Sequence, residues 1–179
     1  IRFIKSSGIF FIGSVLSKAI SILMLPLYTN RIPTDDMGYY DLSLTYITIA
    51  TSFLFFDIWV AILRYMYDGK TKQEQATAIK SGFLIFVVSS VVYLLFGLIF
   101  TWIFNPDAIF LILLYGLFQN ISNLLCFCVR GFQKNKEFAI SGIISTGVNV
   151  LVNLLLILGF GIGYESLYIA AIVGFIAQS

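Results

Sequence analysis

The chain has 179 residues, of which 59% are hydrophobic and 11% are charged, and its formal net charge is +2. Soluble globular domains carry about 25% charged residues, so this composition excludes an ordinary soluble domain and predicts an integral membrane protein. The sequence lacks histidine and clustered cysteines, which excludes zinc sites and histidine-based catalysis for these residues. We therefore expect a protein that is not an enzyme and that uses no cofactor and no metal.

Apolar stretches of the chain predict an all-α membrane fold. The first five stretches are long enough to cross a hydrocarbon layer of about 30 Å at roughly 1.5 Å per residue. Spans are expected at residues 8–28, 42–63, 82–104, 108–129, 138–160 and 167–179. The last one is shorter than the ~17 residues that a span needs, which indicates a fragment that ends inside its sixth helix. Short loops between the spans predict that sequential helices pack antiparallel.

The first predicted span carries Lys18 near its middle and Pro26 near its end. An ammonium group at mid-bilayer costs roughly 2.5–3.5 kcal/mol on insertion scales, so Lys18 is expected to face protein or water. Pro26 removes an amide donor and predicts a helix bend near Ile22. Asp57 in the second span could pair with Lys18 as a structural bridge, or both residues could line a cavity.

Basic residues are distributed unevenly between the loops. The segment before the first span and the loops after the second and fourth spans hold a larger set of basic residues: Arg2, Lys5, Arg64, Lys70, Lys72, Lys80, Arg130, Lys134 and Lys136. The loops at the other ends of the spans hold only Arg31. By the positive-inside rule, the N-terminus and the loops of the larger set are predicted to be cytoplasmic. Most of these basic residues are interpreted as ordinary anchors at the membrane surface.

Two helix starts have local signatures. Thr34 is a candidate cap, and Asp35 and Asp36 follow in a first turn where the helix dipole favours anions. Thr71 and Glu74 fit the capping-box pattern, so a helix is expected to begin there and to continue into the third span.

Amide side chains occur inside two of the apolar spans. Gln119, Asn120 and Asn123 lie at mid-depth of the fourth span, and Asn149 and Asn153 lie one turn apart in the fifth. Such amides often bond to a neighbouring helix for about 0.6 kcal/mol each, which is a purely structural role. Alternatively, they line a cavity and offer hydrogen bonds to a polar substrate.

The segment Leu25–Gly69 reads LPLYTNRIPTDDMGYYD at its start and contains an A-x-x-R-Y pattern near its end. It resembles the opening of bacterial polysaccharide-export flippases of the multidrug/oligosaccharidyl-lipid/polysaccharide (MOP) superfamily. The matching positions are Pro26, Leu27, Thr29, Arg31, Thr34, Asp35, Asp36, Gly38, Tyr39, Ala61, Arg64 and Tyr65. Val129–Ile140 resembles that family's loop between helices four and five. Asn30 and Met37 depart from the pattern.

The resemblance implies a MATE-like transporter of two six-helix lobes around a central cavity, with this chain as the N-terminal lobe. Its substrate would be an oligosaccharide on undecaprenyl pyrophosphate, moved across the bacterial inner membrane by alternating access. The implied partners are this lipid-linked oligosaccharide, the bilayer and the C-terminal lobe, without nucleic acid. The expected cavity residues are Lys18, Asp57, Gln119, Asn123, Asn149 and Asn153, with Arg31 at the outer mouth and Arg64 at the inner mouth.

Other functions remain open from the sequence. A multidrug or cation exporter of the same superfamily would use an acidic cavity, for which Asp57 is the candidate residue. A lipid II flippase is a close variant of the first interpretation. A membrane scaffold without transport activity would use the polar residues only to hold its helices together.

Overall fold

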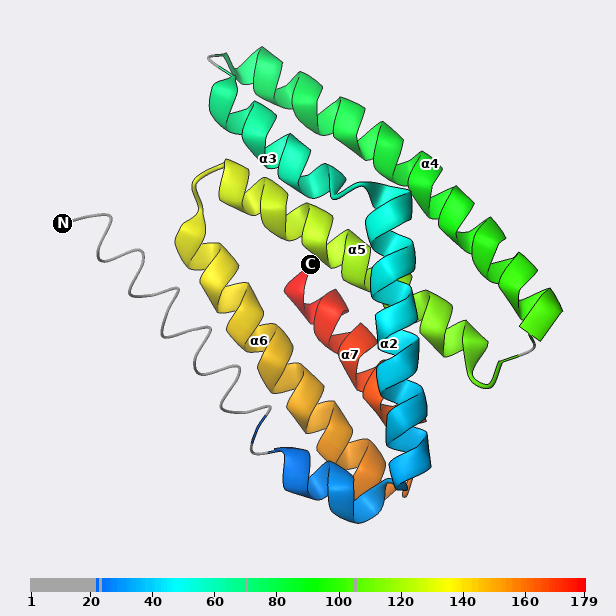
Figure 1. The fold of residues 1–179 in the computed structure, drawn as a ribbon. Coiled ribbons are helices and arrows are strands. Elements are labelled where there is room, and N and C mark those ends of the chain that lie inside the picture. The colour runs from blue at the N-terminus through cyan, green and yellow to red at the C-terminus, as the bar shows by residue number, and fades with distance from the viewer. Residues whose placement is uncertain (1–21, 23, 70, 105) are drawn as a thin grey trace. The chain divides into compact units, whose positions relative to one another are not determined.

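The computed structural model describes residues 22, 24–69, 71–104 and 106–179 (Figure 1). These residues form helices joined by short turns, and no strand occurs among them. The described residues divide by contact into two compact units. One unit is Leu44–Lys134, and the other combines the residues up to Ser43 with Asn135–Ser179.

Several helices are long and apolar enough to cross a membrane. They are α4 (Lys72–Phe104), α5 (Ile109–Gly131), and α6 (Asn135–Leu154) together with the π-helix η1 (Leu155–Gly159) that continues it. A further candidate span is the pair α2 (Thr34–Phe55) and α3 (Ile58–Asp68), and α7 (Glu165–Gln178) is a shorter apolar helix. The prediction of an all-helical, multi-pass membrane protein is therefore confirmed, whereas the six-helix lobe and its MATE-like arrangement stay predictions.

The predicted first span, residues 8–28, lies mostly outside the described residues. Its described part belongs to a helix over residues 24–31, which includes Pro26 and Arg31. The helix continues past Pro26, and the amide of Ile32 donates a hydrogen bond to the carbonyl of Tyr28 at 2.9 Å. The predicted bend near Ile22 involves residues outside the described ones.

The second predicted span, residues 42–63, consists of two helices that together are long and apolar enough to form one broken span. Its two halves, α2 and α3, are bent by 46° at Phe56 and Asp57, which both have a φ of 48°. Left-handed backbone is unfavourable for residues with a side chain, and the sequence offers neither glycine nor proline here. Packing supports the break, because Phe55 before it and Trp59 after it belong to the same buried cluster.

That buried cluster is the core of the unit Leu44–Lys134. Figure 1 shows α3, α4 and α5 side by side, and the cluster lies on the faces they share. Its members are Phe55, Trp59, Ile62, Met66, Phe86, Tyr93 and Leu124. Glycines permit the close approach, because a methyl group on Gly82 would collide with Ile62 and one on Gly116 would collide with Tyr93.

In the other unit, α6 and α7 pack along each other (Figure 1). Gly174 on α7 allows this approach, because a methyl group there would lie 3.1 Å from the carbonyl oxygen of Ser145 on α6. The start of α7 packs against the start of α2. The hydroxyls of Ser43 and Tyr168 are hydrogen-bonded, and the Tyr40 and Tyr168 rings meet edge to face at 4.8 Å.

The helix starts agree closely with their local signatures. α4 begins at Lys72, and the hydroxyl oxygen of Thr71 accepts a hydrogen bond from the Glu74 amide at 3.2 Å. This bond confirms the predicted cap at Thr71. α2 has Asp35 and Asp36 in its first turn as expected, but it begins at Thr34 itself, one residue before the predicted start.

Candidate functional site

Asn149 and Asn153 form a hydrogen-bonded pair one turn apart on α6. The side-chain nitrogen Nδ2 of Asn153 donates to Oδ1 of Asn149 at 3.0 Å. Asn153 is only 2% exposed, and its own Oδ1 is buried with no hydrogen-bond partner among the residues that the structure describes. A buried acceptor without a partner costs about 1–3 kcal/mol, so this amide is a place where a donor from a ligand or a water molecule would be stabilised.

The helix changes its geometry directly after this pair. α6 passes into the π-helix η1 at Leu155, within the predicted span 138–160. π-helical turns are rare, insert an extra residue into the helix and occur frequently at functional sites. The polar pair and the irregular turn therefore mark the same stretch of α6.

On α5, the predicted site residues Gln119 and Asn123 are both half-buried and lie one turn apart. Their spacing of four residues places them on one face of the helix. Asn120 lies on a different face and is 1% exposed, and its Nδ2 donates to the carbonyl of Gly116 at 2.7 Å. The arrangement fits a structural role for Asn120 and leaves Gln119 and Asn123 as the more accessible amides.

Asp57 occupies the break between α2 and α3 and is exposed. It stands at the N-cap position of α3, but its side chain makes no capping hydrogen bond. The side-chain nitrogen Nε of Arg64, seven residues after Asp57, lies 3.8 Å from the carboxylate oxygen Oδ2 of Asp68. The Arg64–Asp68 pair is highly exposed on both sides, and such surface pairs contribute about 0–1 kcal/mol.

The remaining predicted site residues lie in or near the first predicted span. Arg31 and Pro26 are exposed on the helix over residues 24–31. The hydroxyl of Thr29, which lies between them, donates to the carbonyls of Leu25 and Pro26, each at 3.2 Å. Lys18 lies outside the described residues. Its role as the cation of the cavity is therefore a proposal that rests on the sequence.

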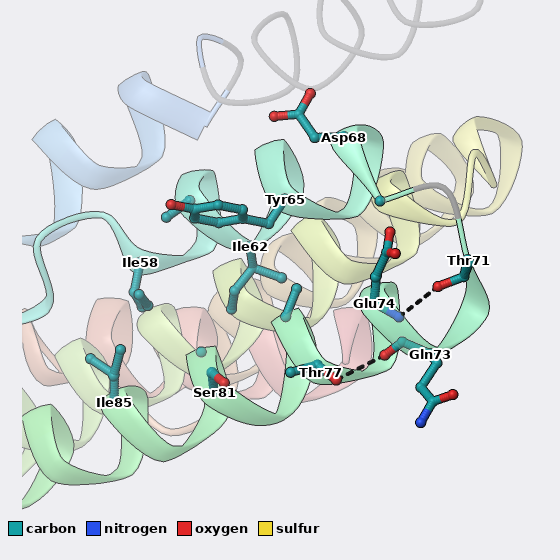
Figure 2. Close-up of a pocket in the computed structure, with 14 residues that line it drawn as sticks. Ile58, Ile62, Tyr65, Asp68, Thr71, Gln73, Glu74, Thr77, Ser81 and Ile85 are labelled. Carbon is teal, nitrogen blue, oxygen red and sulfur yellow. Dashed lines mark hydrogen bonds between the residues drawn. The ribbon is translucent and has the colours of Figure 1, made fainter.

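A groove that the sequence analysis did not predict runs between α3 and the first turns of α4 (Figure 2). Its volume is about 700 Å³. Figure 2 shows Ile58, Ile85 and Ser81 toward one end, and Thr71, Gln73 and Glu74 at the end next to the α3–α4 turn. The polar lining consists of Tyr65, Asp68, Thr71, Gln73, Glu74, Thr77 and Ser81.

One pattern in the sequence could have indicated this groove. Glu74, Thr77 and Ser81 are spaced so that they fall on one face of α4, directly after the capping box. The α3 side of the groove depends on the bend at Phe56–Asp57, which has no sequence signal. Within the described ranges, no group of histidine, cysteine, aspartate and glutamate side chains is arranged to hold a metal ion.

Comparison with known proteins adds one finding. A family model described as "Polysaccharide biosynthesis protein" matches residues 3–179. Neither a curated protein nor a solved structure matches the chain. The matched region includes the helix over residues 24–31, the bent pair α2–α3 and both helices that carry amide pairs.

Proposed function

Because the chain belongs to the polysaccharide biosynthesis protein family of MOP-superfamily flippases, we propose that it moves a lipid-linked oligosaccharide across a membrane. The lipid carrier is undecaprenyl pyrophosphate, and the membrane is the bacterial inner membrane. The protein works by alternating access, in which a second lobe completes the cavity. The family match over residues 3–179 is the observation that carries this proposal.

The chemistry of the substrate supports a role for Lys18. A pyrophosphate is an anion that must pass a region of low dielectric, where an ammonium group stabilises it far more than it would in water. Lys18 is near the middle of the first predicted span, and a lysine in a membrane span is rare and usually functional. We assign Lys18 to the pyrophosphate and Asp57 to the same cavity.

The amides on α5 and α6 support a role in sugar binding. Sugar hydroxyls both donate and accept hydrogen bonds, and amide side chains offer both functions. Asn153 has a buried acceptor without a partner, next to Asn149. Gln119 and Asn123 are half-buried on a membrane-spanning helix. We assign these four amides to the oligosaccharide.

The distribution of basic residues supports the orientation. The loops of the larger basic set face the cytoplasm in this proposal, together with the N-terminus. Arg64 then lies at the inner mouth, and Arg31 lies at the outer mouth. Both side chains are exposed. A charged group at either mouth must be exposed in order to contact a headgroup that enters or leaves the cavity.

The test measures surface glycan in cells whose glycan export depends on the intact protein. Lys18→Ala is expected to reduce surface glycan at least tenfold, and Lys18→Arg is expected to retain much of it because the charge is kept. Lys134→Ala is the matched control, since Lys134 is an exposed lysine outside the predicted spans. Normal export by a Lys18→Ala variant that is present at the normal level would contradict the proposal.

The same variants separate the flippase from other functions. In a cation exporter, Asp57→Asn would abolish efflux of cationic compounds and Lys18→Ala would leave it intact. In a scaffold, every substitution would change only the stability of the protein. A flippase is expected to lose glycan export in Lys18→Ala, which removes the charge, and to retain much of it in Lys18→Arg, which keeps the charge.

A further inference from the structure

The two amides on α6 differ in how accessible they are. Asn153 is 2% exposed, whereas Asn149, one turn earlier, is half-buried. Ile144 and Leu151 are exposed apolar residues of α6, and they lie about 140–160° around the helix from Asn149 at roughly 100° per residue. Asn149 is therefore away from the exposed apolar side of α6, and it is the amide of the pair that a large ligand can reach.

α7 covers this face of α6 with mostly apolar side chains. A methyl group on Gly174 would lie 3.2 Å from Cβ of Asn149, so the backbone of α7 packs directly beside this residue. Over residues 167–177, α7 carries one side chain that can form hydrogen bonds, Tyr168, and its hydroxyl is bonded to that of Ser43. The orientation of the two amides therefore depends on the bond between them.

That bond decides which group of Asn149 is available to a ligand. Nδ2 of Asn153 donates to Oδ1 of Asn149 at 3.0 Å. Because Oδ1 of Asn149 is engaged, its Nδ2 is the group that can donate to a ligand. Turning both amides over would leave Nδ2 of Asn153 buried without that acceptor, and buried donors without a partner are rarer than buried acceptors. The described orientation is therefore the less costly one.

We propose that Asn153 is a positioning residue that acts through Asn149, an inference that rests on the proposed transport of an oligosaccharide. Asn153 holds the amide of Asn149 so that Nδ2 faces the substrate. Asn149 then donates a hydrogen bond to a sugar oxygen that accepts without donating, such as a ring oxygen or the carbonyl oxygen of an acylamino group. The pair thus selects an acceptor at this position of the oligosaccharide.

The first test reverses the polarity of Asn149. Initial rates of leaflet exchange are measured for the intact protein in vesicles over a range of contents of a fluorescent lipid-linked oligosaccharide. Asn149→Asp keeps the shape of the side chain but replaces the donor by an acceptor. It is expected to raise the apparent KM about tenfold, which is the loss of one hydrogen bond. An unchanged apparent KM would overturn the proposed acceptor on the sugar.

A double-variant cycle tests whether Asn153 acts through Asn149. Asn153→Leu alone is expected to raise the apparent KM at least threefold, but to have no further effect when Asn149 is already alanine. Asn120→Leu on α5 is the matched control, since Asn120 is a similarly buried amide that bonds to the carbonyl of Gly116. Any effect of Asn120→Leu is expected to add to that of Asn149→Ala. An equal effect of Asn153→Leu in both backgrounds would show a purely structural residue.

The lipid carrier without sugar identifies the source of the acceptor oxygen. Undecaprenyl pyrophosphate is added as a competitor and is expected to inhibit exchange equally in the unmodified protein and in Asn149→Asp. Weaker inhibition in the variant would assign the acceptor oxygen to the pyrophosphate and would overturn the contact with the sugar.

The orientation of the pair is measured without transport. In nuclear magnetic resonance spectra of the intact protein with isotope-labelled asparagine, the side-chain amide protons of Asn153 are expected to exchange with water at least tenfold more slowly than those of Asn149. Equal or faster exchange at Asn153 would overturn the positioning role. Because this readout needs no substrate, failure of the inference is distinguishable from failure of the proposed transport function.

Discussion

Asn153 donates its only described side-chain hydrogen bond to Asn149, 3.0 Å away on the same helix, and its own Oδ1 remains buried and unpaired. In a scaffold, an amide at this position would be expected to bond across to a neighbouring helix. The described structure instead records a bond within α6, immediately before the π-helix η1. This geometry motivates our proposal that the pair is a polar element kept for a ligand, which the following variant tests.

Asn153→Leu is predicted to separate stability from transport. Leucine has a similar size and removes a buried acceptor that has no partner, so the free energy of unfolding is expected to stay unchanged or rise by about 1 kcal/mol. Glycan export is expected to fall, because the sugar loses its amide contact. Unfolding in a sodium dodecyl sulfate titration and surface glycan in cells measure the two effects. A variant that is destabilised by more than about 1 kcal/mol while export stays normal would show a structural amide instead.

Gly116→Ala is predicted to destabilise the unit Leu44–Lys134 by about 1–3 kcal/mol, which is the usual cost of overpacking. The added methyl group would collide with the hydroxyl of Tyr93 and lie 3.0 Å from a methyl group of Ile47. Gly142→Ala on α6 is the matched control, because a methyl group there would meet no atom of the described residues within 4 Å. Equal stability of the two variants in thermal unfolding would contradict the packing described for α4 and α5.

Phe56→Gly is predicted to stabilise the break between α2 and α3 by about 1 kcal/mol, because glycine adopts the left-handed conformation without strain. Phe56 is 80% exposed, so few contacts within the chain are lost. Phe53→Gly is the control, since Phe53 is similarly exposed but lies inside α2, where glycine costs about 1 kcal/mol. The two variants should therefore shift the free energy of unfolding in opposite directions. A destabilisation of the same size in both would indicate a continuous helix.

Thr71→Ala is predicted to cost about 1 kcal/mol, because it removes the oxygen that caps α4. Thr77→Ala serves as the control, since the Thr77 hydroxyl donates to the carbonyl of Gln73 within the same helix, at 2.9 Å, and does not cap its start. Hydrogen exchange of the amides at the start of α4 measures the effect locally. Exchange there is expected to accelerate in Thr71→Ala alone, and equal acceleration in both variants would exclude the cap.

The features that the sequence predicts well are local ones. Apolar runs predict α4, α5 and α6, because hydrophobic length alone decides whether a helix can span a membrane. The cap at Thr71 follows from two residues three positions apart. The family resemblance also follows from residues that stand close together in the sequence, and the family match over residues 3–179 confirms it.

The features that the sequence did not predict depend on tertiary packing. The break at Phe56–Asp57 contains neither glycine nor proline, and the burial of Phe55 and Trp59 in one cluster accompanies it. The π-helix after Leu154 has no signal in the sequence, and the α3 side of the groove follows the break at Phe56–Asp57. For the candidate site, spacing predicted that Asn149 and Asn153 lie on one face of their helix, whereas their role in a cavity stays a prediction. The role of Lys18 also stays a prediction, because Lys18 lies outside the described residues.

The central claim is that the intact protein transports a lipid-linked oligosaccharide, and reconstituted transport tests it most directly. The protein is placed in vesicles that contain a fluorescent oligosaccharide on undecaprenyl pyrophosphate, and an impermeant quencher reports how much substrate changes leaflet. We predict transport by the unmodified protein, its loss in Lys18→Ala and its retention in Lys134→Ala. Equal leaflet exchange by all three proteins and by protein-free vesicles would contradict the account.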